Sequence, residues 1–162
     1  VIAGPDFEST RPAVESQIAR ANLQQRVSFT GMLKGDLKWS ALSASDLFVL
    51  PSYSEGLSVS VLEAMGVARP VLITTGCNLP EVARYHCGWV VQPTARELET
   101  ALAEALRLRP DQLDEFGKRG RQLVNERYSW SRIGHAMAAV YRWLLGGPAP
   151  STVTILREGE SL

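Results

Sequence analysis

Short runs of apolar residues alternate with longer amphipathic stretches over the first half of the chain. The apolar runs predict strands at residues 1–3, 27–30, 46–50, 70–74 and 88–91. The helical spacing of the other apolar positions predicts helices at 8–22, 36–44, 58–67, 80–84, 97–108, 110–127 and 131–145. Strands that alternate with helices indicate a parallel sheet with helices on both faces. We therefore predict an α/β, Rossmann-like domain over residues 1–146, followed by a flexible tail over 147–162.

Two of these runs, 47–50 and 71–73, are almost continuously apolar, which predicts strands that are covered on both faces. Ligands of such sheets bind beyond the carboxyl ends of the strands, where turns lead into helices. The segments in which a site is expected are therefore 4–8, 31–35, 51–57 and 74–81.

Charge and composition argue against several classes of function. The 17 Lys and Arg residues balance 17 Asp and Glu residues, so no large field of one sign exists to bind nucleic acid. Cys77 and Cys87 are too few for a disulfide framework or a metal cluster, and we predict no metal site. No apolar run reaches about 20 residues, and the first residues lack the features of a signal peptide. We therefore expect a cytoplasmic protein.

A basic run near the C-terminus leaves two interpretations open. Acidic residues interleave with it, which favours a solvated helical face, whereas a peripheral contact with the inner face of a membrane is the alternative. The run comprises Lys118, Arg119, Arg121, Arg127 and Arg132.

Glu63 is the only ionisable residue between Gly56 and Ala68. The predicted helix around it is apolar nearly all round, which predicts that the helix is buried. A carboxylate in such a helix is costly unless it accepts hydrogen bonds, and the two vicinal hydroxyls of a ribose can donate them. A basic side chain elsewhere in the chain, or a small polar window at the surface, is the alternative partner for Glu63.

The turn before this helix has features of an anion site. First-turn amides of a helix have no intrahelical acceptor, and the helix dipole favours an anion beside them. Gly56 lets a phosphate approach the backbone, and Ser58 or Ser60 can cap the helix or donate a hydroxyl. A diphosphate there would repel the carboxylate of Glu55 unless this side chain faced a neutral, hydroxyl-rich group such as a sugar. A solvated loop acid is the alternative for Glu55.

These residues resemble the signature of retaining glycosyltransferase family 4, the glycosyl transferases group 1. Seven residues separate Glu55 from Glu63, as in that signature. The segments that carry the resemblance are 27–31, 45–52, 55–57, 63–65, 70–71, 78–82, 88–91 and 128–130. The resemblance covers about residues 1–145, and it does not specify the sugar.

The resemblance implies that the chain is the C-terminal, donor-binding half of a GT-B fold. Such an enzyme transfers a hexose from a UDP-sugar or GDP-sugar to a glycan or lipid-linked acceptor, as in polysaccharide biosynthesis. It retains the anomeric configuration, and it uses neither a metal nor a cofactor. A stand-alone, non-catalytic sugar-nucleotide module and a doubly wound regulatory domain without a ligand are the alternatives.

The resemblance also assigns roles to single residues. Glu55 is the catalytic residue, which contacts hydroxyls of the donor sugar, and Glu63 holds the ribose. The remaining donor-binding positions are the backbone amides of Gly56, Leu57 and Ser58 at the diphosphate, Met32 and Leu33 at the base, and Gly4 in the first of the expected turns.

The sequence departs from the family pattern at its start. Members place a Gly-Arg turn and a downstream Lys, which grip the diphosphate, well before the segment that matches Val1. This chain has neither, and it also lacks the N-terminal acceptor domain, so the first strand and helix of the donor domain are expected to be missing. We therefore expect this chain alone to bind a nucleoside diphosphate weakly and to transfer no sugar.

Overall fold

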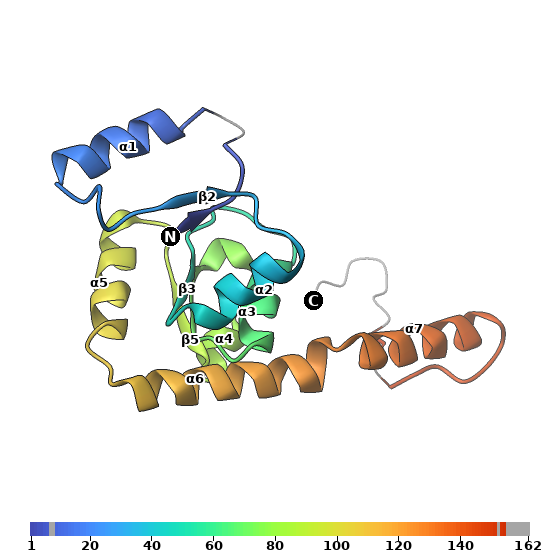
Figure 1. The fold of residues 1–162 in the computed structure, drawn as a ribbon. Coiled ribbons are helices and arrows are strands. Elements are labelled where there is room, and N and C mark those ends of the chain that lie inside the picture. Colours follow the sequence, from blue (N-terminus) through green and yellow to red (C-terminus); the bar gives the residue numbers. More distant parts are fainter. Residues whose placement is uncertain (7–8, 152, 155–162) are drawn as a thin grey trace. The chain divides into compact units, whose positions relative to one another are not determined.

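The computed structural model describes residues 1–6, 9–151 and 153–154 (Figure 1). The chain divides into two compact units, Val1–Ala44 and Ser45–Leu162, and each is described by itself.

The first unit contains two parallel strands, β1 (Ile2–Ala3) and β2 (Phe29–Gly31), which are connected through helix α1 (Arg11–Arg20). Helix α2 (Gly35–Ala44) follows β2. Asp36 therefore lies inside the first turn of this helix, which begins one residue before the predicted start at 36. The predicted start of α1 at Glu8 lies outside the described residues. None of the residues described in this unit is buried.

The second unit contains a parallel sheet of the strands β3 (Phe48–Leu50), β4 (Val71–Thr74) and β5 (Gly88–Val91), in the order β3-β4-β5. All four residues of the central strand β4 are buried, as predicted. The prediction of two covered faces was wrong for β3, in which Val49 is 41% exposed, because β3 lies at the edge of this three-stranded sheet.

Two helices form most of the core of this unit together with β4. Val61, Ala64 and Met65 of α3 (Val59–Gly66) are buried, and α3 packs against α6 (Pro110–Leu123). A Cβ on Gly117 of α6 would lie 2.0 Å from the carbonyl oxygen of Ala68, so a glycine is needed for this close approach.

Four further elements of the second unit precede its last helix. They are the 3-10 turn η1 (Thr75–Cys77), α4 (Glu81–Arg84), α5 (Ala95–Ala105) and the π-helical turn η2 (Val124–Tyr128). Parallel strands connected through helices form the Rossmann-like α/β arrangement that the sequence predicts. Most boundaries of the predicted strands and helices agree to within two or three residues.

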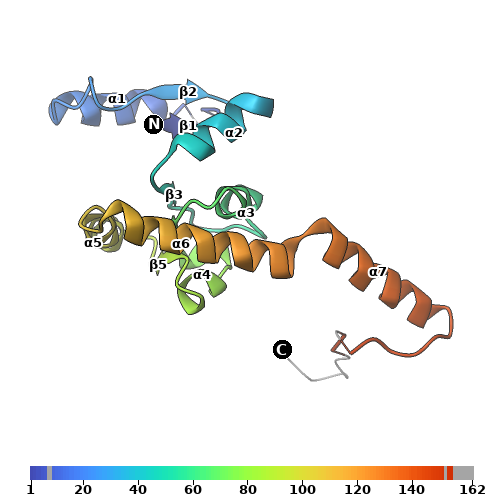
Figure 2. The same ribbon diagram turned by 60° about the horizontal axis from the view of Figure 1, so that its bottom comes forward.

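The last helix, α7 (Trp130–Leu144), follows η2 and leads away from the end of α6 (Figure 2). One stripe of this helix is apolar and exposed, and it includes Trp130, which is 87% exposed, and Leu144, which is 70% exposed. Over the part of the chain that the structure describes, no helix has the length and apolar character needed to cross a membrane. The tail predicted over 147–162 falls partly on residues 152 and 155–162, which lie outside the described residues.

Candidate functional site

The turn between β3 and α3 carries Glu55 and is held by the turn that follows β4. The amide of Glu55 donates to the carbonyl oxygen of Gly76 at 2.8 Å. The carbonyl oxygen of Glu55 accepts a hydrogen bond from Nδ2 of Asn78 at 2.6 Å. Both backbone groups of Glu55 are thus fixed by one neighbouring turn, while its side chain is half-buried.

Gly76 makes this contact between the two turns possible. A Cβ at position 76 would lie 2.4 Å from the carbonyl oxygen of Tyr53 and 2.7 Å from that of Ser52, which is closer than real Cβ atoms come. The hydroxyl of Thr74 also donates to the carbonyl oxygen of Ser52. The turns after β3 and β4 therefore contact each other directly through main-chain atoms at the carboxyl ends of the two strands.

Gly56 borders open space in this unit. A Cβ built on Gly56 would meet no atom within 4 Å, and the neighbouring Leu57 is 50% exposed. Of the three residues whose amides are predicted to face a phosphate, Gly56 and Leu57 are exposed, whereas Ser58 is buried.

Ser58 begins α3, but it does not cap the helix with its side chain. Its backbone is extended, with φ −75° and ψ 99°, and its hydroxyl lies 3.2 Å from that of Ser60. Of the roles predicted for Ser58 or Ser60, capping by the Ser58 side chain is not observed, because this hydroxyl pairs with that of Ser60. The first-turn amides keep no intrahelical acceptor, as at any helix start.

Glu63 lies on α3 away from the face that packs on the core. The buried residues Val61, Ala64 and Met65 follow helical spacing, whereas Glu63 is half-buried and Val59 is 61% exposed. The prediction that this helix is buried all round was wrong, because an eight-residue helix packs on the sheet and on α6 with one face only. The partly open face is the one that carries the carboxylate.

Three predicted site residues belong to the first unit. Gly4 follows β1 in a left-handed backbone conformation, with φ 137°, and its amide donates to the carbonyl oxygen of Gly31 at 2.9 Å. Met32 and Leu33 come directly after Gly31, so the turns after β1 and β2 lie side by side. Met32 is exposed and Leu33 is half-buried.

Sequence reasoning assigned no role to Gly76 or Asn78, although both lie in a segment where a site was expected. A signal for Asn78 existed, because asparagine tolerates the left-handed conformation better than most residues and its side chain bonds to backbone groups. Asn78 has φ 51° and ψ 37°. No sequence signal identifies the carbonyl to which its side chain donates.

The two buried cysteines, Cys77 and Cys87, add no further chemistry to this site. Burial raises the pKa of the Cys87 thiol to about 11, an effect that the positive charge of Arg119 partly offsets, so this thiol is protonated at neutral pH. Cys77 is buried against the end of β3, and its thiol donates to the carbonyl oxygen of Leu50 at 3.6 Å. Among residues 1–6, 9–151 and 153–154, no group of three or more His, Cys, Asp or Glu side chains could hold a metal ion.

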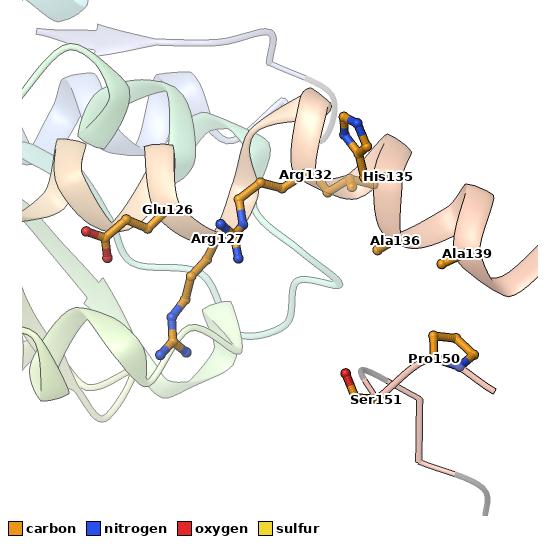
Figure 3. Close-up of a pocket in the computed structure, with 9 residues that line it drawn as sticks. Glu126, Arg127, Arg132, His135, Ala136, Ala139, Pro150 and Ser151 are labelled. Atoms are coloured by element: carbon orange, nitrogen blue, oxygen red, sulfur yellow. The ribbon is translucent and has the colours of Figure 1, made fainter. Parts of the chain in front are cut away.

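A hollow of about 700 Å³ lies elsewhere in the second unit, beside η2 and α7 (Figure 3). Its polar side chains do not converge: in Figure 3 the ring of His135 points away from Pro150. The guanidinium of Arg127 leaves the hollow to lie over the ring of Tyr85, 5.0 Å from its centroid. None of the predicted site residues lines this hollow.

Parallel strands that are connected through helices define a Rossmann-like domain, a class of fold that binds ligands beyond the carboxyl ends of its strands. Comparison with known proteins identifies its family. The chain belongs to the glycosyl transferases group 1, whose family model matches residues 1–123.

Curated relatives agree with this assignment. The chain is 31% identical over 143 residues to an alpha-D-kanosaminyltransferase of Streptomyces kanamyceticus, a match that covers 88% of this chain and 36% of the relative. It is 36% identical over 108 residues to an alpha-maltose-1-phosphate synthase of Mycolicibacterium smegmatis, which covers 62% and 28% of the two chains. The chain thus spans about a third of the length of these relatives.

Solved glycosyltransferases share the fold. A sucrose-phosphate synthase from Thermosynechococcus elongatus superposes with a TM-score of 0.76 at 28% identity, over 88% of this chain and 37% of that one. An Anabaena protein solved in complex with UDP and glucose superposes with a TM-score of 0.73 over 86% of this chain and 39% of that one. Its identity is 18%, so it supports the fold alone. These likenesses confirm the predicted family and the GT-B type of fold.

Proposed function

We propose that this chain binds the nucleotide-diphospho-sugar donor of a retaining glycosyltransferase that transfers a hexose to a glycan or lipid-linked acceptor. The observation that carries the proposal is the turn from Glu55 to Ser58, in which the backbone of Glu55 is hydrogen-bonded to the turn after β4 and Gly56 is exposed. Membership of the glycosyl transferases group 1 supplies the class of ligand.

The diphosphate lies at the start of α3 in this proposal. The amides of Gly56, Leu57 and Ser58 donate to its oxygens, and the helix dipole stabilises its negative charge. Gly56 suits this position because nothing occupies the space beside its Cα.

The two acids recognise the sugars on either side of the diphosphate. Glu63 accepts hydrogen bonds from the ribose hydroxyls on the partly open face of α3, and Glu55 accepts them from the transferred hexose. Gly4, Met32 and Leu33 belong to the first unit and remain predicted contacts of the base, which is uracil or guanine.

The chemistry of this proposal consists of positioning and charge stabilisation. The leaving diphosphate gains negative charge as the glycosidic bond breaks, and prearranged amides stabilise that charge more in the transition state than in the ground state. Neither a metal nor a cofactor is part of the proposal. Acceptor binding requires groups outside this chain, so we propose that the chain alone binds the donor weakly and transfers no sugar.

Glu63→Gln tests the ribose contact. For whichever of UDP and GDP the chain binds, we expect roughly ten- to hundredfold weaker binding, since a hydrogen bond to a charged group contributes about 1.5–3 kcal/mol. The 2′,3′-dideoxy form of that nucleotide should bind the variant and the parent equally. Calorimetric titration measures both, and Glu99→Gln on the exposed face of α5 is the matched control.

Glu55→Gln tests the hexose contact separately. The parent chain should bind the nucleotide sugar more tightly than the free nucleotide. In Glu55→Gln this difference in affinity should disappear, while the affinity for UDP or GDP stays unchanged. Amide spectra of the parent chain without any shift at millimolar UDP or GDP would contradict the proposed function.

A further inference from the structure

The peptide bond between Glu55 and Gly56 is held in one orientation by a side chain from another turn. Its carbonyl oxygen accepts a hydrogen bond from Nδ2 of Asn78 at 2.6 Å. The preceding peptide is fixed as well, because the amide of Glu55 donates to the carbonyl oxygen of Gly76 at 2.8 Å.

The orientation of this carbonyl determines where the next amide points. In a planar trans peptide the C=O and the N–H lie on opposite sides of the chain, and the Glu55–Gly56 bond is trans. Since the carbonyl points toward Asn78, the N–H of Gly56 points away from the turn after β4. The space beside Gly56 is open.

The backbone at Asn78 is fixed by its conformation and by a hydrogen bond. Its backbone is left-handed at the end of η1, and its amide donates to the carbonyl oxygen of Thr75 at 3.3 Å. The same 3-10 turn carries Gly76, whose missing Cβ allows the close contact with Tyr53. Asn78 therefore extends from a rigid base toward the Glu55 carbonyl.

We propose that Asn78 is a positioning residue that keeps the Gly56 amide turned toward the diphosphate of the donor. This inference rests on the proposed function. Glycine gives the Glu55–Gly56 peptide unusual freedom to rotate, because Gly56 has no Cβ to restrict φ. The Asn78 hydrogen bond removes that freedom before the ligand arrives, so the amide is oriented in advance.

Asn78→Gly is the test, because glycine adopts the left-handed conformation without strain and lacks only the donor. We expect this variant to bind UDP or GDP roughly tenfold more weakly, a factor that corresponds to about 1.4 kcal/mol. Its affinity for the matching nucleoside, uridine or guanosine, should stay unchanged because a nucleoside carries no phosphate. Asn78→Asp, which keeps the size and removes the donor, should lose at least as much nucleotide affinity.

A matched control and a spectral measurement separate positioning from stability. Asn22 is exposed in the first unit with a similar φ of 55°, so Asn22→Gly should leave the ratio of nucleotide to nucleoside affinity unchanged. In the parent chain the Gly56 amide resonance should shift on addition of UDP or GDP, and in Asn78→Gly this shift should shrink.

The outcomes distinguish the two proposals. A parent chain that does not prefer the nucleotide over the nucleoside overturns the proposed function and this inference together. The parent chain can instead prefer the nucleotide. If Asn78→Gly then keeps the same ratio of nucleotide to nucleoside affinity and the same shift of the Gly56 amide resonance, the role of Asn78 alone is overturned.

Discussion

Single residues in the turns after β3 and β4 differ in whether the fold explains them. Gly76 is explained by contact, since a side chain there would overlap main-chain atoms of Ser52 and Tyr53. Gly56 is not explained in this way, because its φ lies outside the left-handed region and its surroundings are open. The proposed diphosphate provides a reason for glycine at position 56.

Gly56→Ala should therefore separate stability from binding. We expect the free energy of unfolding to stay unchanged or to rise by about 0.4–1 kcal/mol, because alanine restricts the unfolded chain. Affinity for UDP or GDP should fall, since the methyl group occupies the space that the phosphate needs. Thermal melting and calorimetric titration measure the two effects.

Gly66→Ala in α3 is the control for Gly56→Ala. Position 66 has equally open surroundings and is not part of the proposed site, so this change should leave nucleotide affinity as it is. Equal affinities of Gly56→Ala and the parent chain would contradict the proposed position of the diphosphate.

At the scale of elements, the sequence predicted the strands and helices well because their apolar periodicity is strong. Boundaries were less accurate where a side-chain cap decides them. α5 begins at Ala95 and not at Glu97, because the hydroxyl of Thr94 accepts a hydrogen bond from the amide of Glu97 at 3.3 Å. The Thr-x-x-Glu spacing is a readable capping signal. The contact between Asn78 and Glu55 was not predictable, since it depends on how two turns meet in space.

Alanine at Gly117 of α6 and alanine at Gly134 of α7 should change the free energy of unfolding in opposite directions. Gly117→Ala should lower the free energy of unfolding by roughly 1–3 kcal/mol, because its Cβ would overlap the Ala68 carbonyl and force α3 and α6 apart. Gly134→Ala in α7 should raise it by about 1 kcal/mol, since a Cβ there meets nothing within 4 Å and alanine favours the helix. Urea unfolding measures both, and destabilisation of similar size by the two changes would refute this explanation.

At the scale of the whole molecule, the described core belongs to one unit. The fully buried side chains, from Val61 to Leu123, all lie within Ser45–Leu162. The sequence predicted a single domain over 1–146, because alternating strands and helices continue through both units. The pattern does not reveal how burial is distributed between them.

A fragment of residues 45–162 should therefore fold by itself. We expect it to keep a cooperative thermal transition, while residues 1–44 alone should show none because they bury no described side chain. Circular dichroism of the two fragments is the measurement. A noncooperative melt of the longer fragment would show that its core depends on the first unit.

The close contact of Gly76 with the main chain of Ser52 and Tyr53 limits which substitutions the turns after β3 and β4 can accept together. The atoms that a Cβ would meet are main-chain atoms, so no exchange of the side chain at position 52 or 53 can compensate for a substitution at 76. Second-site suppressors within this pair of turns would have to insert or delete a residue. Under the proposed function, point mutations that alter donor preference are therefore compatible with the fold at the exposed Leu57 and incompatible with it at Gly76.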